Sequence, residues 1–89
     1  MNQDYNSFEL ELVGFSYKNK LEVEWIEVQS PNGNFVVGPD HSPIISLLKE
    51  RSKLIYKKIN SNEQEIDIYG GIFSLIDNKA LVILNLLSN

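Results

Sequence analysis

The sequence contains no cysteine, only one histidine and few basic residues. Without cysteine the chain can form no disulfide, thiolate metal site or iron–sulfur cluster and has no thiol nucleophile, which fits a reducing compartment. Eight basic residues stand against twelve acidic ones, for a net charge of −4 at pH 7. Nucleic-acid binding depends on clustered lysine and arginine, so this charge argues against a nucleic-acid partner.

Long apolar segments are also missing. The longest apolar run, residues 80–84, is far shorter than the roughly 20 residues that a membrane-spanning helix needs. Residues 1–5 lack the basic and apolar regions of a signal peptide. We therefore expect no direct insertion into a membrane.

Several short segments instead show the alternation of apolar and polar residues that is typical of half-buried strands. Residues 8–12, 21–25 and 66–69 show it most clearly. Many short strands at regular spacing indicate a sandwich or barrel. We predict an all-β protein, with residues 1–7 as an N-terminal tail and residues 8–87 as a single β-sandwich domain.

Interruptions of the alternation predict a bulge and two turns. The register changes at Ile26, which indicates a β-bulge near Trp25 and Ile26. Residues 30–34 are rich in turn-forming types and predict a surface loop. Residues 77–79 predict a tight hairpin turn with Asn78 at positive φ.

Residues 44–59 fit two structures. Their apolar residues fall near helical spacing and follow a Ser-Pro pair, which favours a helix. The same stretch also fits a turn-like segment at residues 44–49 followed by a strand at residues 53–59. The local pattern leaves both structures open.

No group of residues predicts a catalytic site. His41 lies in a proline-flanked loop, and its sequence neighbours Asp40 and Ser42 do not have the arrangement of a catalytic triad. The pair Gly70-Gly71 is not followed by the Lys-Ser or Lys-Thr of a phosphate-binding loop. We predict that the protein is not an enzyme and uses no cofactor or metal.

Two longer segments match one family pattern in order and spacing. Residues 33–48 read Gly-Asn-Phe-Val-Val-Gly-Pro-Asp-His-Ser-Pro-Ile-Ile-Ser-Leu-Leu, against the family's Gly-Glu-Phe-Gly-Val-Leu-Pro-Gly-His-Ala-Pro-Leu. Residues 69–84 match a hairpin with Gly-Gly-Phe-Leu-Glu-Val, Asp-Asn and Val-Thr-Val-Leu. In both segments the chain resembles the epsilon subunit of the rotary ATP synthases, which is called delta in mitochondria.

This resemblance implies a β-sandwich or flattened barrel of about ten strands. It resolves residues 44–59 toward a turn near residues 44–48 and a strand at residues 53–59. Most family members continue as a C-terminal helical hairpin, so the chain resembles a short form with the N-terminal sandwich only. In longer members that hairpin slows ATP hydrolysis, and we expect no such braking here.

The resemblance also implies a role. Epsilon subunits are non-catalytic parts of the central stalk of a proton-translocating ATP synthase, where they bind the gamma subunit and the c-ring and couple ion flow to ATP synthesis. By position, Asn32, Gly33 and Asn34 would face the c-ring, and His41, Ser42 and Pro43 would face gamma.

The expected location is the cytoplasmic face of a bacterial inner or plasma membrane, as a peripheral subunit, or the equivalent place in an organelle. The strand pattern alone fits one alternative equally well: a stand-alone β-sandwich adaptor unrelated to ATP synthase.

Overall fold

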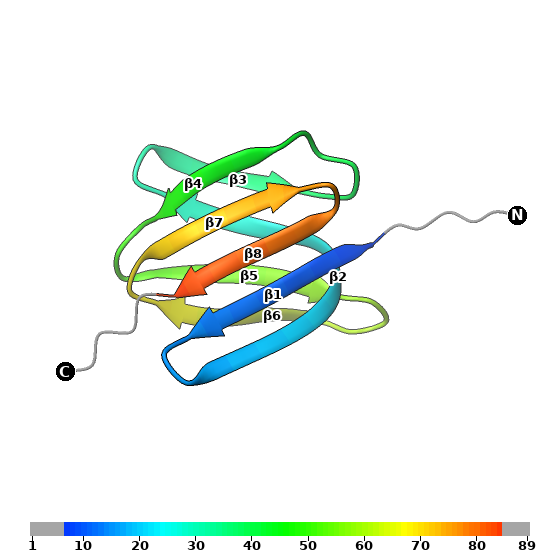
Figure 1. Ribbon diagram of the computed structural model, residues 1–89, viewed down its shortest axis with the longest axis horizontal. Coiled ribbons are helices and arrows are strands. Elements are labelled where there is room, and N and C mark those ends of the chain that lie inside the picture. The colour runs from blue at the N-terminus through cyan, green and yellow to red at the C-terminus, as the bar shows by residue number, and fades with distance from the viewer. Residues whose placement is uncertain (1–6, 85–89) are drawn as a thin grey trace, which may run out of the picture.

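The computed structural model describes residues 7–84, which form eight strands and their connections (Figure 1). The strands are β1 (Phe8–Gly14), β2 (Tyr17–Ser30), β3 (Gly33–Val37), β4 (Ile44–Leu48), β5 (Ser52–Lys58), β6 (Glu63–Ile68), β7 (Gly71–Ile76) and β8 (Lys79–Leu84). This confirms the all-β prediction. Within the described range no helix is long and apolar enough to cross a membrane. Residues 1–6 of the predicted tail and residues 85–87 of the predicted domain lie outside the described residues.

One long strand joins the two layers of the sandwich. The strand order is β4-β7-β8-β1-β2-β5-β6, and β3 also pairs with β2. The first half of β2 pairs with β1, while its second half pairs with β3 and β5. Between these halves the register shifts, between Val23 and Trp25. A bulge bends a strand and increases its twist, so this predicted irregularity lies where β2 passes from one layer to the other (Figure 1).

The core lies between the layers and is filled by inward-facing residues from each of the eight strands. Along β1, Phe8, Leu10 and Leu12 are buried because alternate side chains point to the same face. Phe73 of β7 meets Phe35 of β3 edge to face, with ring centroids 6.1 Å apart and an interplanar angle of 68°. The other buried apolar residues are Val23, Ile26, Val28, Val37, Leu48, Leu54, Tyr56, Ile68, Leu75, Ala80 and Val82.

Residues 44–48 form strand β4, so both the helix and the turn expected there are wrong. β4 pairs antiparallel with β7, from Ile44 opposite Leu75 to Leu48 opposite Gly71. The backbone hydrogen bonds of this pairing come from a segment distant in sequence, and they override the helical spacing of the apolar residues. The strand expected at residues 53–59 is confirmed as β5.

The number of strands also differs from the expectation. Residues 7–84 contain eight strands rather than about ten. One reason is that β2 runs without interruption for 14 residues and serves both layers as a single strand.

Candidate interaction surfaces

The outer face of β4, β7 and β8 carries apolar side chains that no other part of residues 7–84 covers. Ile45 is 78% exposed and Leu47 is 62% exposed, although both lie in regular strand. Leu47 stands opposite Ile72, which in turn stands opposite Ile83. Directly opposed residues on one face of a sheet lie about 5 Å apart, so these side chains are neighbours. We call this surface the apolar outer face; it consists of Ile45, Leu47, Ile72, Ile76 and Ile83.

The composition of these strands differs from that of a solvent-facing sheet. In β1 the outward positions include Glu9 and Glu11, as expected where water covers the sheet. In β7 both faces are apolar, since Phe73 points inward while Ile72 points outward. A contiguous exposed apolar patch of this kind is a candidate binding surface.

Asn32, Gly33 and Asn34 lie together at the exposed end of the β2–β3 hairpin. The hydroxyl of Ser30 accepts a hydrogen bond from the Asn32 N–H at 3.3 Å and donates one to the Gly33 carbonyl at 2.6 Å. Gly33 adopts φ 135°, a conformation that side-chain-bearing residues rarely adopt. The hairpin therefore presents these three residues in a defined conformation.

His41, Ser42 and Pro43 lie at the opposite end of β3, in the loop that leads into β4 (Figure 1). The Nδ1 atom of His41 is 2.7 Å from the carbonyl oxygen of Ser42 and donates to it, because a carbonyl can only accept. The histidine ring is thus engaged with the backbone of its own loop. The structure does not bring this loop next to the Asn32–Asn34 hairpin; the two sites lie at different ends of the sandwich.

A pair of hydrogen bonds anchors the His41 loop to the β7–β8 turn. The Asp40 N–H donates to Asn78 Oδ1 at 2.7 Å, and Asn78 Nδ2 donates to Asp40 Oδ1 at 3.0 Å. Both residues have positive φ, 63° for Asp40 and 61° for Asn78. The predicted positive φ at Asn78 is confirmed, and Asp77 shares it at 51°. Two central residues at positive φ define the type I′ turn favoured in two-residue hairpins.

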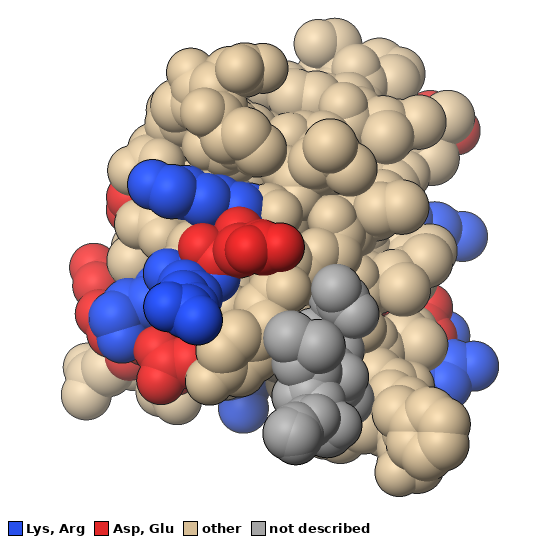
Figure 2. Space-filling model, turned by 90° about the vertical axis from the view of Figure 1, so that its left-hand side faces the viewer, with Lys and Arg blue, Asp and Glu red and all other residues tan. Residues whose placement is uncertain are grey.

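The end of the molecule that carries the Asn32–Asn34 hairpin has two shallow hollows. One, of about 490 Å³, lies between Pro31, the end of β4 and the Gly70–Gly71 corner. The other, of about 370 Å³, is lined by Arg51, Ser52, Lys53, Asp67, Ile68 and Tyr69. Tyr69 lines both hollows. Figure 2 shows this end, where charged side chains of both signs gather over one part and neutral side chains cover much of the rest.

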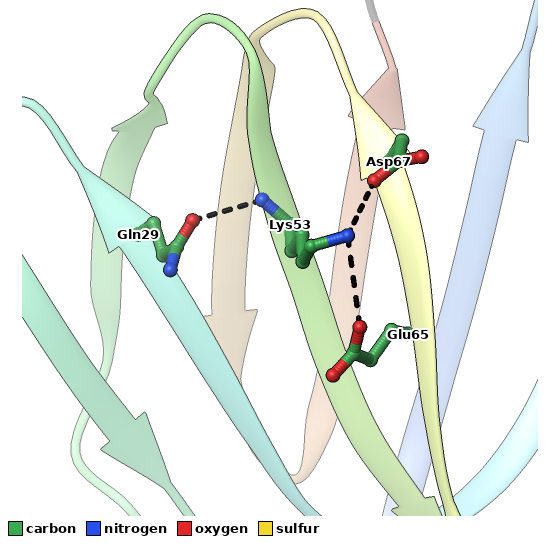
Figure 3. A network of polar contacts seen from close by, with 4 residues as sticks. All are labelled: Gln29, Lys53, Glu65 and Asp67. Carbon is green, nitrogen blue, oxygen red and sulfur yellow. Dashed lines mark hydrogen bonds and ion pairs between the residues drawn. The ribbon is translucent and has the colours of Figure 1, made fainter.

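Lys53 holds a small polar network beside the second hollow (Figure 3). Its Nζ lies 2.8 Å from Asp67 Oδ1 and 3.6 Å from Glu65 Oε1, while its backbone N–H donates to Gln29 Oε1 at 2.8 Å. The hydrogen bond that the Lys53 ammonium donates to Asp67 and the negative charge of Asp67 raise the pKa of Lys53 above its ordinary value. The network ties β5 to both β2 and β6.

None of these groups has the geometry of a catalytic or metal site. Among the described residues, no three histidine or acidic side chains gather in a way that could hold a metal ion. Sequence reasoning placed the interaction sites in loops and missed the apolar outer face. The signal was present in residues 72–76 and 80–84, where apolar residues occupy both alternating positions.

The chain matches one protein-family model over most of its length. Residues 10–86 match the model described as the beta-sandwich domain of the ATP synthase delta/epsilon chain. No curated protein matches the chain at a significant level.

Solved structures of mitochondrial ATP synthases contain chains with the same fold. A chain of the Euglena gracilis mitochondrial ATP synthase, in a structure of OSCP, F1 and the c-ring, matches with a TM-score of 0.83 and 15% identity over 93% of this chain. A chain of the Tetrahymena thermophila mitochondrial ATP synthase, in a structure of the central stalk and c-ring, matches with a TM-score of 0.72 and 12% identity over 91% of this chain. The matches span 53% and 65% of those two chains.

Proposed function

We propose that this chain, which belongs to the family of ATP synthase delta and epsilon chains, binds the gamma subunit and the c-ring in the central stalk of that enzyme. In this role it does no bond chemistry; it couples ion flow to ATP synthesis by joining two rotating parts. Family membership sets aside the alternative of an adaptor unrelated to ATP synthase. Among the features of the structure, the apolar outer face carries the proposal.

The apolar outer face is the surface that suits gamma. Removing exposed apolar area from water contributes about 25 cal/mol per Å², and Ile45, Leu47 and Ile72 offer such area in adjacent strands. Three short strands cover an area of roughly 15 by 20 Å, about 300 Å². This is less than the roughly 800 Å² that each partner contributes to a standard interface, so a neighbouring segment should take part in the contact. The loop of His41, Ser42 and Pro43 continues directly into β4, so it would extend the same contact, as the family resemblance implied.

The Asn32–Asn34 hairpin remains the proposed contact with the c-ring. Its exposed amide groups can both donate and accept hydrogen bonds. It lies at one end of the sandwich, beside the hollow that Leu47 of the apolar outer face also lines. The two proposed contacts would therefore meet at Leu47.

The proposed location is peripheral, on the membrane-bound enzyme. From the sequence we expect a bacterial inner or plasma membrane, or the equivalent place in an organelle. Both structural neighbours come from mitochondrial enzymes, and this favours the organelle. The proposed role also requires a stiff protein, because torque must pass through it. The densely packed core between the two layers supplies that stiffness.

Replacing Ile45 by lysine tests the gamma contact. Ile45 is the most exposed member of the apolar outer face, so Ile45→Lys should leave the melting temperature almost unchanged while weakening binding to purified gamma by about tenfold or more. Val36→Lys is the matched control, because Val36 is 58% exposed on β3, outside this face. Titration calorimetry measures the affinity of both variants for gamma. The proposed gamma surface is contradicted if both variants lose affinity equally, or if Ile45→Lys loses none.

A further inference from the structure

Arg51 has a backbone conformation that its residue type does not favour. In the described range, five residues other than glycine have positive φ, and four of them are asparagine or aspartate, which tolerate it. Arg51, at φ 53°, is the fifth. An arginine held there costs free energy that glycine would not. A residue kept in an unfavourable conformation on the surface suggests that its side chain has a function.

The turn that holds Arg51 is fixed on both sides. The Lys49 N–H donates to the Gln29 carbonyl at 2.9 Å, and the Ser52 hydroxyl donates to the Lys49 carbonyl at 2.6 Å. The Lys53 N–H donates to Gln29 Oε1 at 2.8 Å. These bonds position the turn independently of the Arg51 side chain, which therefore projects from a rigid support.

The positive charge of Arg51 is exposed, whereas that of its neighbour Lys53 is neutralised. Lys53 pairs with both Asp67 and Glu65. Arg51 lies within 4.0 Å of no carboxylate in residues 7–84. A guanidinium presents a rigid fork of donors that matches a carboxylate in bidentate fashion. Arg51 is thus suited to an acidic group supplied by a partner.

The shape of the two hollows favours a polypeptide loop as the partner that carries this acidic group. Arg51 lines one hollow together with Lys53 and Asp67, which pair with each other. Tyr69 lines both hollows, and the walls of the second combine Pro31, Leu47 and Leu48 with Lys49 and Glu50 at its rim. A polypeptide loop can place a carboxylate in the first hollow and a small apolar side chain in the second. A flat lipid surface cannot enter either one.

We infer that this end of the protein receives an acidic loop of the c-ring, with its carboxylate bound by Arg51 and an adjacent apolar residue lodged beside Leu47. The inference rests on the proposed function, since it takes the ring as the partner at the Asn32–Asn34 end. It adds a charged anchor to a hairpin whose own tip, Asn32 to Asn34, is uncharged.

The variant Arg51→Gly should change ring affinity and thermal stability in opposite directions, so a loss of binding cannot be explained by a loss of folding. Glycine adopts the positive φ without strain, so the melting temperature should rise, whereas affinity for detergent-solubilised c-ring should fall about tenfold. Added salt should weaken ring binding of the native chain more than that of the variant. Lys58→Gln is the control, because it removes one positive charge from an exposed residue at the far end of β5 and should leave ring binding unchanged. Arg51→Lys keeps the charge without the fork and should bind with intermediate affinity.

Three results would overturn the inference. Unchanged ring affinity in Arg51→Gly would remove Arg51 from the contact, and a fall in its melting temperature would contradict the strain. If Arg51→Gly lost binding to vesicles rich in anionic phospholipid but kept its affinity for the ring, the ligand of Arg51 would be a lipid headgroup instead. The proposed function fails by a different result, namely that the native chain binds neither gamma nor the ring.

Discussion

At the scale of single residues, Asn78 joins three segments that are distant in sequence. Its backbone turns β7 into β8 at positive φ, and its side chain exchanges two hydrogen bonds with Asp40. Its carbonyl oxygen also accepts a bond from the Glu9 N–H at 3.0 Å. The positive φ could be predicted from the residue type, because asparagine tolerates this conformation. The partners Asp40 and Glu9 could not, since they depend on the way the layers fold.

Replacing Asn78 by valine should destabilise the protein by about 1 to 3 kcal/mol. A β-branched residue resists positive φ, and the two bonds to Asp40 are lost as well. Asn78→Gly loses the same bonds but keeps the conformation, so it should be less destabilising than Asn78→Val. Thermal unfolding of both variants measures the difference. A valine variant as stable as the glycine variant would show that the conformation at this turn carries no cost.

At the scale of strands, the sequence predicted those whose alternation is strong and missed the one whose pattern is mixed. β1 reads as a strand because glutamates alternate with buried apolar residues. β4 has apolar residues on both faces, which resembles helical spacing as much as a strand. What makes β4 a strand is β7, more than twenty residues later in the chain. No local pattern contains that pairing, and the apolar outer face depends on it.

The contact between Phe73 and Phe35 links strands of the two layers and should dominate their packing. Phe73 is fully buried, and Phe35 is partly buried against the same cluster. Phe73→Ala should therefore cost about 3–5 kcal/mol, a large share of the total stability of a domain this size. Phe35→Ala should cost clearly less, because part of its ring already contacts water. Urea unfolding gives both values, and equal losses would argue against a core centred on Phe73.

At the scale of the whole molecule, the candidate surfaces arise from topology. β4, β7 and β8 form one outer face although β5 and β6 separate β4 from the other two strands in sequence. The hairpin of Asn32 and the turn of Arg51 reach the same end because β2 and β4 both end there, as the bond from Lys49 to Gln29 shows. The family resemblance suggested sites in the loops, but it did not reveal the apolar face or the role that we infer for Arg51, since both depend on side chains that meet only in three dimensions.

If the two surfaces bind two different partners, a substitution in one surface should not change the binding of the other partner. Ile45 precedes the end of β4 by three residues, about 10 Å along the strand, and Arg51 lies beyond that end. Effects at sites this far apart usually add. The double variant Ile45→Lys with Arg51→Gly should therefore lose affinity for gamma as the first change alone does, and for the ring as the second alone does.

In a reconstituted synthase the double variant should slow ion-driven ATP synthesis more than either single change, while the catalytic head keeps hydrolysing ATP. This follows if, as proposed, each contact is a separate link in the path by which ring rotation reaches the head. The control carries Val36→Lys with Lys58→Gln and should synthesise ATP normally, because both residues lie outside the two proposed surfaces. Paired measurements of synthesis and hydrolysis distinguish the outcomes: if hydrolysis fell together with synthesis, the chain would act on the catalytic head itself and not as a coupling between rotor parts.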